Sequence, residues 1–390
     1  MKLQEFQAKR VLSLYGLTCP EGRVAITADE AQAMAAEIGA ERLIVKAQIL
    51  AGDRASAGGV RAAGSPAEVG AIARELLGKP LVTPQTGPEG QVVHRVLVEA
   101  AIGVARELYL TMAVDGATGT LLLIGSAAGG SAIEQRHRSG AATLETLRFN
   151  TRGETLGGDV AGFCARIGLE GQVARDGAET IRRLHQAMIG LDARLIEINP
   201  LVVDAAGALT VVDAKIEIDD NALFRHPELA QLRDDDEVDE IELEAQRHQL
   251  NFMQMDGDIG LVVNGAGLGL ATVDMIFDAG GRPANFMDIR TTAKSLDIAH
   301  GVGLVLDNPR AKVLLVNVYG GGMQACDTII EGLAIAVRRK GRALPTILRL
   351  GGKNEDLARL RLDSFKLPIV ELADMAQAVE RAVAIAHGGM

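Results

Sequence analysis

The sequence contains no tryptophan, and aromatic side chains make up only 3% of its 390 residues. With so few aromatic residues, the core must be built from alanine, valine, leucine and isoleucine. Cysteine is also scarce: Cys19, Cys164 and Cys326 are an odd number without the spacing of a metal site. This usage is typical of a reduced protein, and we expect a cytoplasmic location.

Long apolar runs and an excess of positive charge are both missing. No run approaches the roughly 20 apolar residues of a membrane-spanning helix, and the first residues lack the apolar centre of a signal peptide, so we expect no membrane partner. The 40 basic residues are outnumbered by 51 acidic ones, and the net charge of −11 argues against a nucleic-acid partner. An anionic small molecule must therefore be bound by a local pocket rather than attracted by the overall field.

Glycine is abundant, at 45 residues, and the pattern of the chain changes along its length. Strand-like and helix-like segments first mix in an α+β order, whereas strands and helices alternate regularly toward the C-terminus, which is typical of a parallel sheet with helices on both faces. A charged run, 233–247, separates the two patterns and is typical of a solvated helix or a linker. We predict an α/β protein with domains at 1–235 and 256–390, joined by an acidic linker over 236–255.

Individual elements can be predicted in both parts. In the first part we expect strands at 43–48, 95–99, 107–114 and 120–124, the last two as a hairpin, and amphipathic helices at 29–39, 67–77 and 174–190. In the second part we expect strands at 258–264, 283–288, 312–318 and 345–350, each followed by a glycine or polar turn. Ligands of such sheets bind at the carboxyl ends of the strands.

Lys46 lies in a predicted strand, and the glycine-bearing loop 52–60 follows it. Backbone N–H groups of such a loop, together with a lysine, can hold phosphates. The loop lacks the signature of a Walker phosphate loop, and a surface hairpin beside a solvent-directed lysine is the alternative.

Asn199 and Asp213 are predicted at the ends of two neighbouring strands. Amide and carboxylate oxygens in that position suit Mg²⁺, which takes hard oxygen ligands and phosphates. A hairpin with a polar cap would produce the same pattern.

Two glycine turns, 264–269 and 320–324, follow strands and open predicted helices. Free N–H groups at a helix start favour an anion such as a carboxylate or phosphoryl group. The first turn also approaches a dinucleotide-binding fingerprint, but its third glycine comes one position early. The seven histidines show no metal-ligand spacing, and we expect most of them to be surface or core residues.

Several segments, in this order and over nearly the full length, resemble the β subunit of ADP- or GDP-forming succinyl-CoA synthetase. They are LQEFQAK (3–9), VKAQ (45–48), VEA (98–100), RELYL (106–110), LIEINPL (195–201), DNALFR (220–225), VNGAGL (263–268) and PANF (283–286). The resemblance implies an ATP-grasp module of two subdomains over residues 1–232, followed by a flavodoxin-like CoA-ligase domain.

The resemblance also implies an activity. The family joins a carboxylic acid to CoA using ATP or GTP with Mg²⁺, through an acyl phosphate and a phosphohistidine. The histidine and most of the CoA site belong to a separate α subunit, so we expect an αβ or α2β2 assembly.

Roles for individual residues follow from the same resemblance. Lys46 and the loop residues Asp53, Arg54 and Ala55 would hold the triphosphate. Glu99, Glu107 and the backbone at Ile102 would meet the adenine and ribose, while Asn199 and Asp213 would bind Mg²⁺. Asn264 and the turn Gly321, Gly322 and Met323 would contact the carboxylate substrate or the phosphohistidine.

Two segments depart from the family pattern. The family's Gly-Gly-Arg-Gly-Lys loop is Gly-Asp-Arg-Ala-Ser at 52–56, which removes a lysine and adds a carboxylate. A degenerate subunit with a structural or regulatory role is therefore the main alternative; an NAD enzyme rests only on the 264–269 glycines. Three glycines of the family are replaced by Arg290, Thr291 and Thr292, which can bind a second carboxylate or a hydroxyl group. We expect a substituted dicarboxylate such as malate instead of plain succinate.

Overall fold

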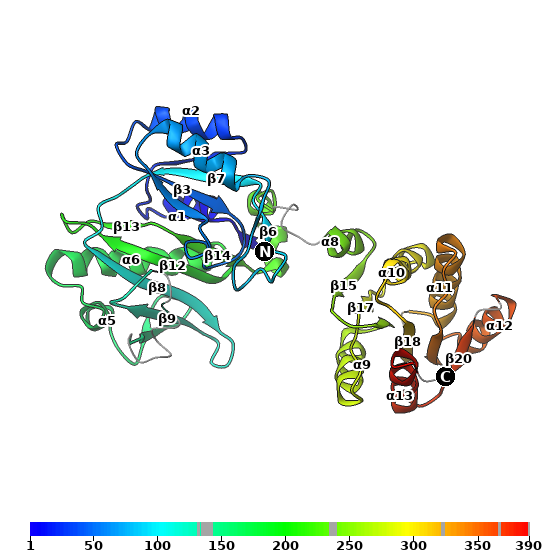
Figure 1. Cartoon of the computed structure of the whole chain (residues 1–390). Helices are drawn as coiled ribbons and strands as arrows, with labels where there is room; N and C mark the ends of the chain where they lie inside the picture. Colours follow the sequence, from blue (N-terminus) through cyan, green and yellow to red (C-terminus); the bar gives the residue numbers. More distant parts are fainter. Residues whose placement is uncertain (131–132, 134–142, 234–239, 321–323, 366–367, 389–390) are drawn as a thin grey trace. The chain divides into compact units, whose positions relative to one another are not determined.

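The computed structural model describes residues 1–130, 133, 143–233, 240–320, 324–365 and 368–388. They fall into two compact units, Met1–Glu237 and Val238–Met390 (Figure 1). In the described part of the chain, no helix combines the length and apolar character that crossing a bilayer requires.

The first unit contains a small antiparallel sheet of four strands in the order β2-β7-β3-β4. Its elements are β2 (Gly22–Ala25), α2 (Ala28–Ile38), β3 (Leu43–Gln48), β4 (Val60–Ala63), α3 (Pro66–Leu76) and β7 (Arg95–Ala100). Thr27 caps α2 by accepting a hydrogen bond from the N–H of Glu30, and Ala31 and Ala35 line its buried face. Because these side chains are small, α2 and α3 pack closely together over the sheet (Figure 1). A short hairpin of β5 (Pro80–Leu81) and β6 (Gln91–Val92) lies between α3 and β7 in the chain.

A larger antiparallel sheet, with the strand order β1-β14-β12-β8-β9-β10-β11, completes the first unit, and β13 pairs with β12. Its strands are β1 (Lys2–Leu3), β8 (Arg106–Asp115), β9 (Thr120–Ser126), β10 (Glu145–Phe149), β11 (Thr155–Leu156), β12 (Ala193–Val203), β13 (Leu209–Val211) and β14 (Ala214–Ile218). The helices are α1 (Glu5–Leu14), α5 (Val160–Arg166), α6 (Gly171–Gly190), the 3-10 helix η1 (Asp220–Arg225) and α7 (Pro227–Ala230).

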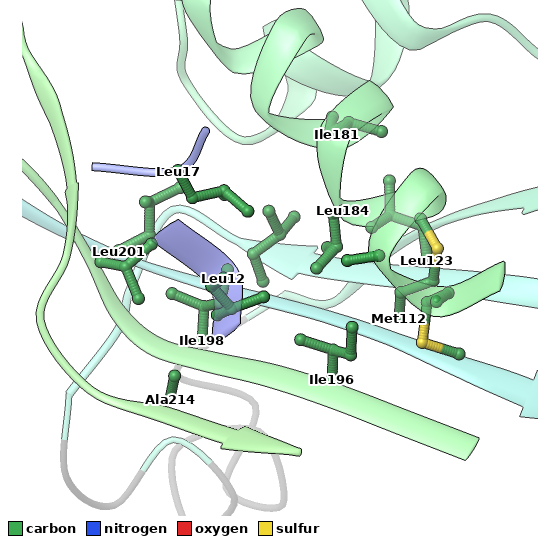
Figure 2. Packing of buried hydrophobic residues seen from close by; sticks show 14 of the residues in the cluster. Leu12, Leu17, Met112, Leu123, Ile181, Leu184, Ile196, Ile198, Leu201 and Ala214 are labelled. Atoms are coloured by element: carbon green, nitrogen blue, oxygen red, sulfur yellow. The ribbon is translucent and has the colours of Figure 1, made fainter. Parts of the chain in front are cut away.

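The core of this sheet is aliphatic, as the composition predicts. Ile181 and Leu184 lie three positions apart on α6 and are fully buried, so they share one helix face. Figure 2 shows them beside sheet residues such as Met112 and Ile196 and close to Leu12 of α1.

The second unit has a six-stranded sheet in the order β15-β17-β16-β18-β19-β20, in which β15 alone of these strands runs antiparallel. Its strands are β15 (Leu250–Gln254), β16 (Ile259–Val263), β17 (Asn285–Ile289), β18 (Val313–Gly320), β19 (Thr346–Gly352) and β20 (Ile369–Glu371). Its helices are α8 (Glu240–Arg247), α9 (Ala266–Asp278), α10 (Ser295–Asp307), α11 (Cys326–Lys340), α12 (Glu355–Phe365) and α13 (Met375–Ala386). Successive residues of β16 point to opposite faces of the sheet and enter two different cores. Leu261 packs with α9 and α13, and Val262 packs with α10 and α11.

The predicted strands and helices match these elements within a few residues, and β8 and β9 form the predicted hairpin. The linker expected over 236–255 requires a correction, because α8 and β15 lie within it. β15 pairs with β17, and Leu250 is fully buried in the core of the second unit. The charged side chains of this segment hid a short strand whose apolar residues are only Leu250, Phe252 and Met253.

Candidate functional site

Six charged side chains meet inside the first unit and are called the charged cluster below. They are Glu5 and Lys9 of α1, Lys46 of β3, Arg54 of the loop after β3, Glu99 of β7 and Asp213, directly before β14. All except Asp213 are less than a tenth exposed. Three cations therefore face three carboxylates in a largely dry environment, where an unpaired charge would be very costly.

Glu5 contacts all three cations of the charged cluster. Its Oε1 lies 2.7 Å from Lys46 Nζ and 3.2 Å from Lys9 Nζ, and its Oε2 lies 2.7 Å from Arg54 Nη2. Burial alone would raise the pKa of Glu5, but the charges of Lys46, Arg54 and Lys9 outweigh burial and hold that pKa well below its ordinary value. Sequence reasoning gave Glu5 no role, although Glu5 and Lys9 are a helix-spaced pair beside the apolar positions of α1.

Lys46 is held as an ammonium ion. Its Nζ donates to Val212 O at 2.7 Å and pairs with Glu99 Oε2 at 2.8 Å. Burial lowers the pKa of Lys46, but Glu5, Glu99 and Asp213 more than reverse this effect, and the pKa lies above its ordinary value. The predicted nucleotide residue Glu99 is thus a counter-ion of Lys46, and it also pairs with Lys9.

The loop after β3 turns Arg54 inward and leaves Asp53 and Ala55 exposed. Arg54 Nη1 donates to Ala47 O at 2.8 Å, and Nη2 lies 2.7 Å from Asp213 Oδ2. Burial opposes the charge of Arg54, but Asp213 and Glu5 outweigh it and raise its pKa. Asp53 has a φ of 57°, a left-handed conformation that aspartate tolerates, and the N–H of Gly59 closes the turn on Arg54 O at 2.7 Å. The loop therefore supplies one buried cation, Arg54.

Asn199 and Asp213 lie on adjacent strands, as expected, and the N–H of Asn199 donates to Asp213 O at 3.1 Å. The pairing of β12 with β8 shifts register between Ile198 and Leu201, which sets Asn199 at an irregular point of the strand. Asn199 Oδ1 accepts a hydrogen bond from Gly130 N at 2.7 Å. The side chain of Asp213 is 35% exposed. An amide oxygen and an accessible carboxylate fit Mg²⁺, which completes its shell with phosphates and water.

Glu107 lies close to Gly130, the residue whose N–H donates to Asn199. It lies at the start of β8, and its backbone carbonyl accepts a hydrogen bond from Gly129 N at 2.8 Å. A Cβ on Gly130 would lie 2.5 Å from Glu107 Oε2, and Gly130 has a φ of 81°, so this position favours glycine. Gly130 thus separates Glu107 from Asn199. Ile102 lies between β7 and β8, half-buried.

In the second unit, polar groups gather where the parallel strands β16, β17 and β18 end. Asn264 Oδ1 accepts a hydrogen bond from Tyr319 N at 3.0 Å, which ties the ends of β16 and β18 together. Asp288 Oδ1 accepts one from Gly265 N at 2.6 Å, at the start of α9. The residue before α9 is Gly265, and among the described residues no side chain caps the helix, so its first N–H groups suit an anion.

The replaced glycine segment lies at the same edge. Arg290, Thr291 and Thr292 are exposed. Arg290 Nε and Nη2 donate to Asn251 Oδ1 at 3.1 and 2.9 Å, and Asn251 Nδ2 donates to Asp288 Oδ2 at 3.2 Å. Asn251, which sequence reasoning missed, thereby links Arg290 to Asp288. The predicted substrate residues Gly321, Gly322 and Met323 lie outside the described residues.

Comparison with known proteins agrees with the division of the chain into two units. Residues 2–203 match the family model of the ATP-grasp domain, and residues 262–383 match that of CoA-ligase. The chain is similar in fold to an ATP citrate lyase from Methanothrix soehngenii, solved with citrate and coenzyme A. The TM-score is 0.73 and the identity 18%, with 98% of each chain covered.

Curated relatives are similar over their whole length. The succinate–CoA ligase [ADP-forming] β subunit of Chlorobium chlorochromatii is 41% identical, covering 98% of this chain and 100% of the relative. The β subunits of the same name from Geobacillus kaustophilus (40% identity, 98% and 99% covered) and Burkholderia cenocepacia (39%, 100% of both) are comparably similar. With its ATP-grasp and CoA-ligase parts in the same order, the chain belongs to the succinate–CoA ligase β-subunit family.

Proposed function

We propose that the chain is the nucleotide-binding β subunit of an ADP- or GDP-forming ligase that makes an acyl-CoA from a dicarboxylate, CoA and ATP or GTP. The charged cluster is the observation that carries the proposal. Lys46 and Arg54 are buried cations whose pKa values are raised, so both stay charged at every physiological pH. Cations fixed in this way are suited to phosphate oxygens in a site that excludes water.

Asn199 and Asp213 would hold Mg²⁺ beside these cations. When bound, the ion would neutralise phosphate charge during phosphoryl transfer. Glu107, next to Asn199 across Gly130, would meet the adenine and ribose region together with the backbone of Ile102. In the second unit, Asn264 and the start of α9 would bind a carboxylate or a phosphoryl group.

The remaining machinery is proposed to lie on an α subunit. This partner would carry the phosphohistidine and most of the CoA site, in an αβ or α2β2 assembly. The family's subunit naming supports the partner.

We further propose a substituted dicarboxylate such as malate as the acid. Arg290 presents a guanidinium fork steadied by Asn251, and Thr291 and Thr292 are exposed beside it. A fork and hydroxyl groups match an extra hydroxyl or carboxylate better than three glycines would.

Two observations favour a second candidate, a degenerate subunit with a structural or regulatory role. Arg54 occupies Asp213 Oδ2, one of the oxygens offered to the metal, and Ser56 replaces the loop lysine of the family. Nucleotide binding decides between the two candidates.

The test is calorimetric titration of the chain with Mg-ATP and Mg-GTP, using K46A and the surface control K79A. Micromolar binding that is lost in K46A and kept in K79A supports the ligase. Binding to neither nucleotide, with or without the α subunit, favours the degenerate subunit.

The acid is tested in the reconstituted complex by comparing CoA-thioester formation from succinate and malate. We expect a preference for malate that is reversed when residues 290–292 are replaced by three glycines. A clear preference of the unmodified protein for succinate contradicts the malate proposal and leaves the ligase proposal standing.

A further inference from the structure

Two histidines and a glutamate meet in the second unit, and the proposed function uses none of them. Glu244 lies on α8, His248 directly after it and His300 on α10. The atoms that each residue offers as a ligand all lie within 4.8 Å of one another. The two imidazole rings stack, with centroids 3.9 Å apart and planes inclined by 19°.

The two distances from Glu244 to the histidines are longer than hydrogen bonds and match those between two ligands of one ion, although the stacked rings would have to turn for both Nε2 lone pairs to meet it. Glu244 Oε1 lies 3.6 Å from His248 Nε2 and 3.4 Å from His300 Nε2. Hydrogen bonds from nitrogen to oxygen span about 2.7–3.2 Å. Ligand atoms at the corners of a tetrahedron around zinc, with bonds of about 2.1 Å, lie about 3.4 Å apart.

Neighbouring groups orient these ligand atoms. His248 Nδ1 lies 3.2 Å from Asp297 Oδ1, which leaves His248 Nε2 facing Glu244. Arg247 Nη1 donates to the other glutamate oxygen, Oε2, at 3.1 Å, so Oε1 faces the rings. A carboxylate behind a histidine is the usual support of a histidine that binds a metal.

His300 Nε2 is the second, independent observation. This atom is buried, and among the described residues it has no hydrogen-bond partner. A buried imidazole nitrogen without a partner is unfavourable, and a metal bond would satisfy it. The nearby cation Lys340 pairs with Asp307, which reduces its repulsion of a bound ion.

We propose that Glu244, His248 and His300 bind a divalent transition-metal ion, with zinc as the best match. Two imidazole nitrogens and one carboxylate favour zinc over magnesium or calcium, which prefer oxygen ligands. Three protein ligands leave a fourth position for water. The ion ties α8 to α10 and is separate from the magnesium proposed at Asn199 and Asp213.

The experiment is a competition titration of Zn²⁺ against a chromogenic chelator, on the full chain without nucleotide. Excess Mg²⁺ is present to occupy oxygen-ligand sites. We expect one tightly bound equivalent, weakened about 100-fold or more in H300N and in E244Q. D297N should weaken binding about tenfold, because it disturbs only the support of His248. H94N, at an exposed histidine of the first unit, should bind normally.

Two further readouts are independent of activity. Co²⁺ should give the visible absorption of a four-coordinate site in the unmodified chain and not in H300N. Zn²⁺ should raise the melting temperature of the unmodified chain and leave that of H300N unchanged. A cooperative melting transition of H300N without zinc shows that the variant folds.

Three results would overturn the proposal. The first is the absence of zinc binding at micromolar concentrations. The second is equal affinity in the unmodified chain, H300N and E244Q. The third is binding that survives in H300N and is lost in C19S, which would place the ion at a cysteine.

Discussion

Glu5 joins three cations that come from different parts of the first unit, and this makes it the most informative single residue to change. Replacing it in E5Q keeps the shape of the side chain and leaves three buried cations against two carboxylates. We expect a loss of about 3–5 kcal/mol in the free energy of unfolding, as when one partner of a buried ion pair is removed. Urea denaturation of E5Q and of the unmodified chain measures this loss of unfolding free energy. E41Q, at an exposed position, is the control, and an equal effect in both variants would contradict the role of Glu5.

The stabilisation by Glu5 should also depend on pH. Its pKa is lowered in the folded state, so its contribution is present above the unfolded value of about 4.3 and is lost as pH falls through the folded value. The pKa of Lys46 is raised, so its contribution is present below the unfolded value of about 10.4 and is lost only as pH rises through the folded value. The difference in unfolding free energy between the unmodified chain and E5Q should be constant from about pH 5 to 9 and shrink in acid. A difference that grows in acid would contradict this assignment.

The sequence predicted which side chains lie next to each other where the pairing of two strands brings them together. Asn199 and Asp213 are adjacent because β12 and β14 pair, and the strands could be recognised from their apolar residues. The inward orientation of Arg54 was not predictable, because it depends on Glu5 and on Asp213, 159 positions away. A loop sequence contains no signal for partners so distant in the chain.

Two glycines in connecting segments, Gly130 and Gly119, offer a matched pair of substitutions. G130A and G119A both place an alanine at a positive φ, so both should lose about 1 kcal/mol of stability. Gly119 has open space around it, whereas a Cβ at Gly130 meets Glu107. Only G130A should weaken Mg-ATP binding, by about fivefold, because it displaces Glu107. Calorimetric titration of both variants measures this, and equal affinities would argue against a nucleotide contact by Glu107.

β15 can be tested as a structural element. Leu250 is fully buried, whereas Met253 on the same strand is 56% exposed. L250A should destabilise the second unit by about 2–5 kcal/mol, and M253A should change its stability by less than about 0.5 kcal/mol. Thermal unfolding followed by calorimetry compares them. A mild effect of both would mean that this segment behaves as a linker after all.

The ligands of the proposed zinc site show a different limit of sequence reasoning at the element scale. Glu244 and His248 are four positions apart, a helix-face spacing that the sequence displays, but the surrounding charges obscured it. His300 joins them from α10, and the approach of two helices cannot be deduced from the spacing within one.

At the scale of the whole molecule, the net charge of −11 bears on how an anionic nucleotide arrives. The charged cluster is balanced, with three cations and three carboxylates, so it offers no excess positive charge to attract phosphates over a distance. We expect the association rate of Mg-ATP to stay constant or rise as salt increases from about 0.05 to 0.3 M, because salt screens the overall repulsion. Stopped-flow measurements with a fluorescent nucleotide test this. A steep fall would show that a positive local field dominates.

The order of the domains was predictable at this scale, because strands and helices alternate in the second unit and not in the first. The point where the second unit begins was harder to predict, because a charged run is compatible with a linker and with a solvated helix. α8 begins at Glu240, inside that run.

The balance of the charged cluster has a consequence for how the site would fill. A phosphate group entering it cannot simply add to unpaired cations, because each cation already has a carboxylate partner. It must act as a replacement counter-ion, as in an ion exchanger. A phosphate group that paired with Arg54 would release Asp213, and this carboxylate is the one proposed to bind the magnesium ion. Phosphate and metal would therefore load the site together, each making room for the other.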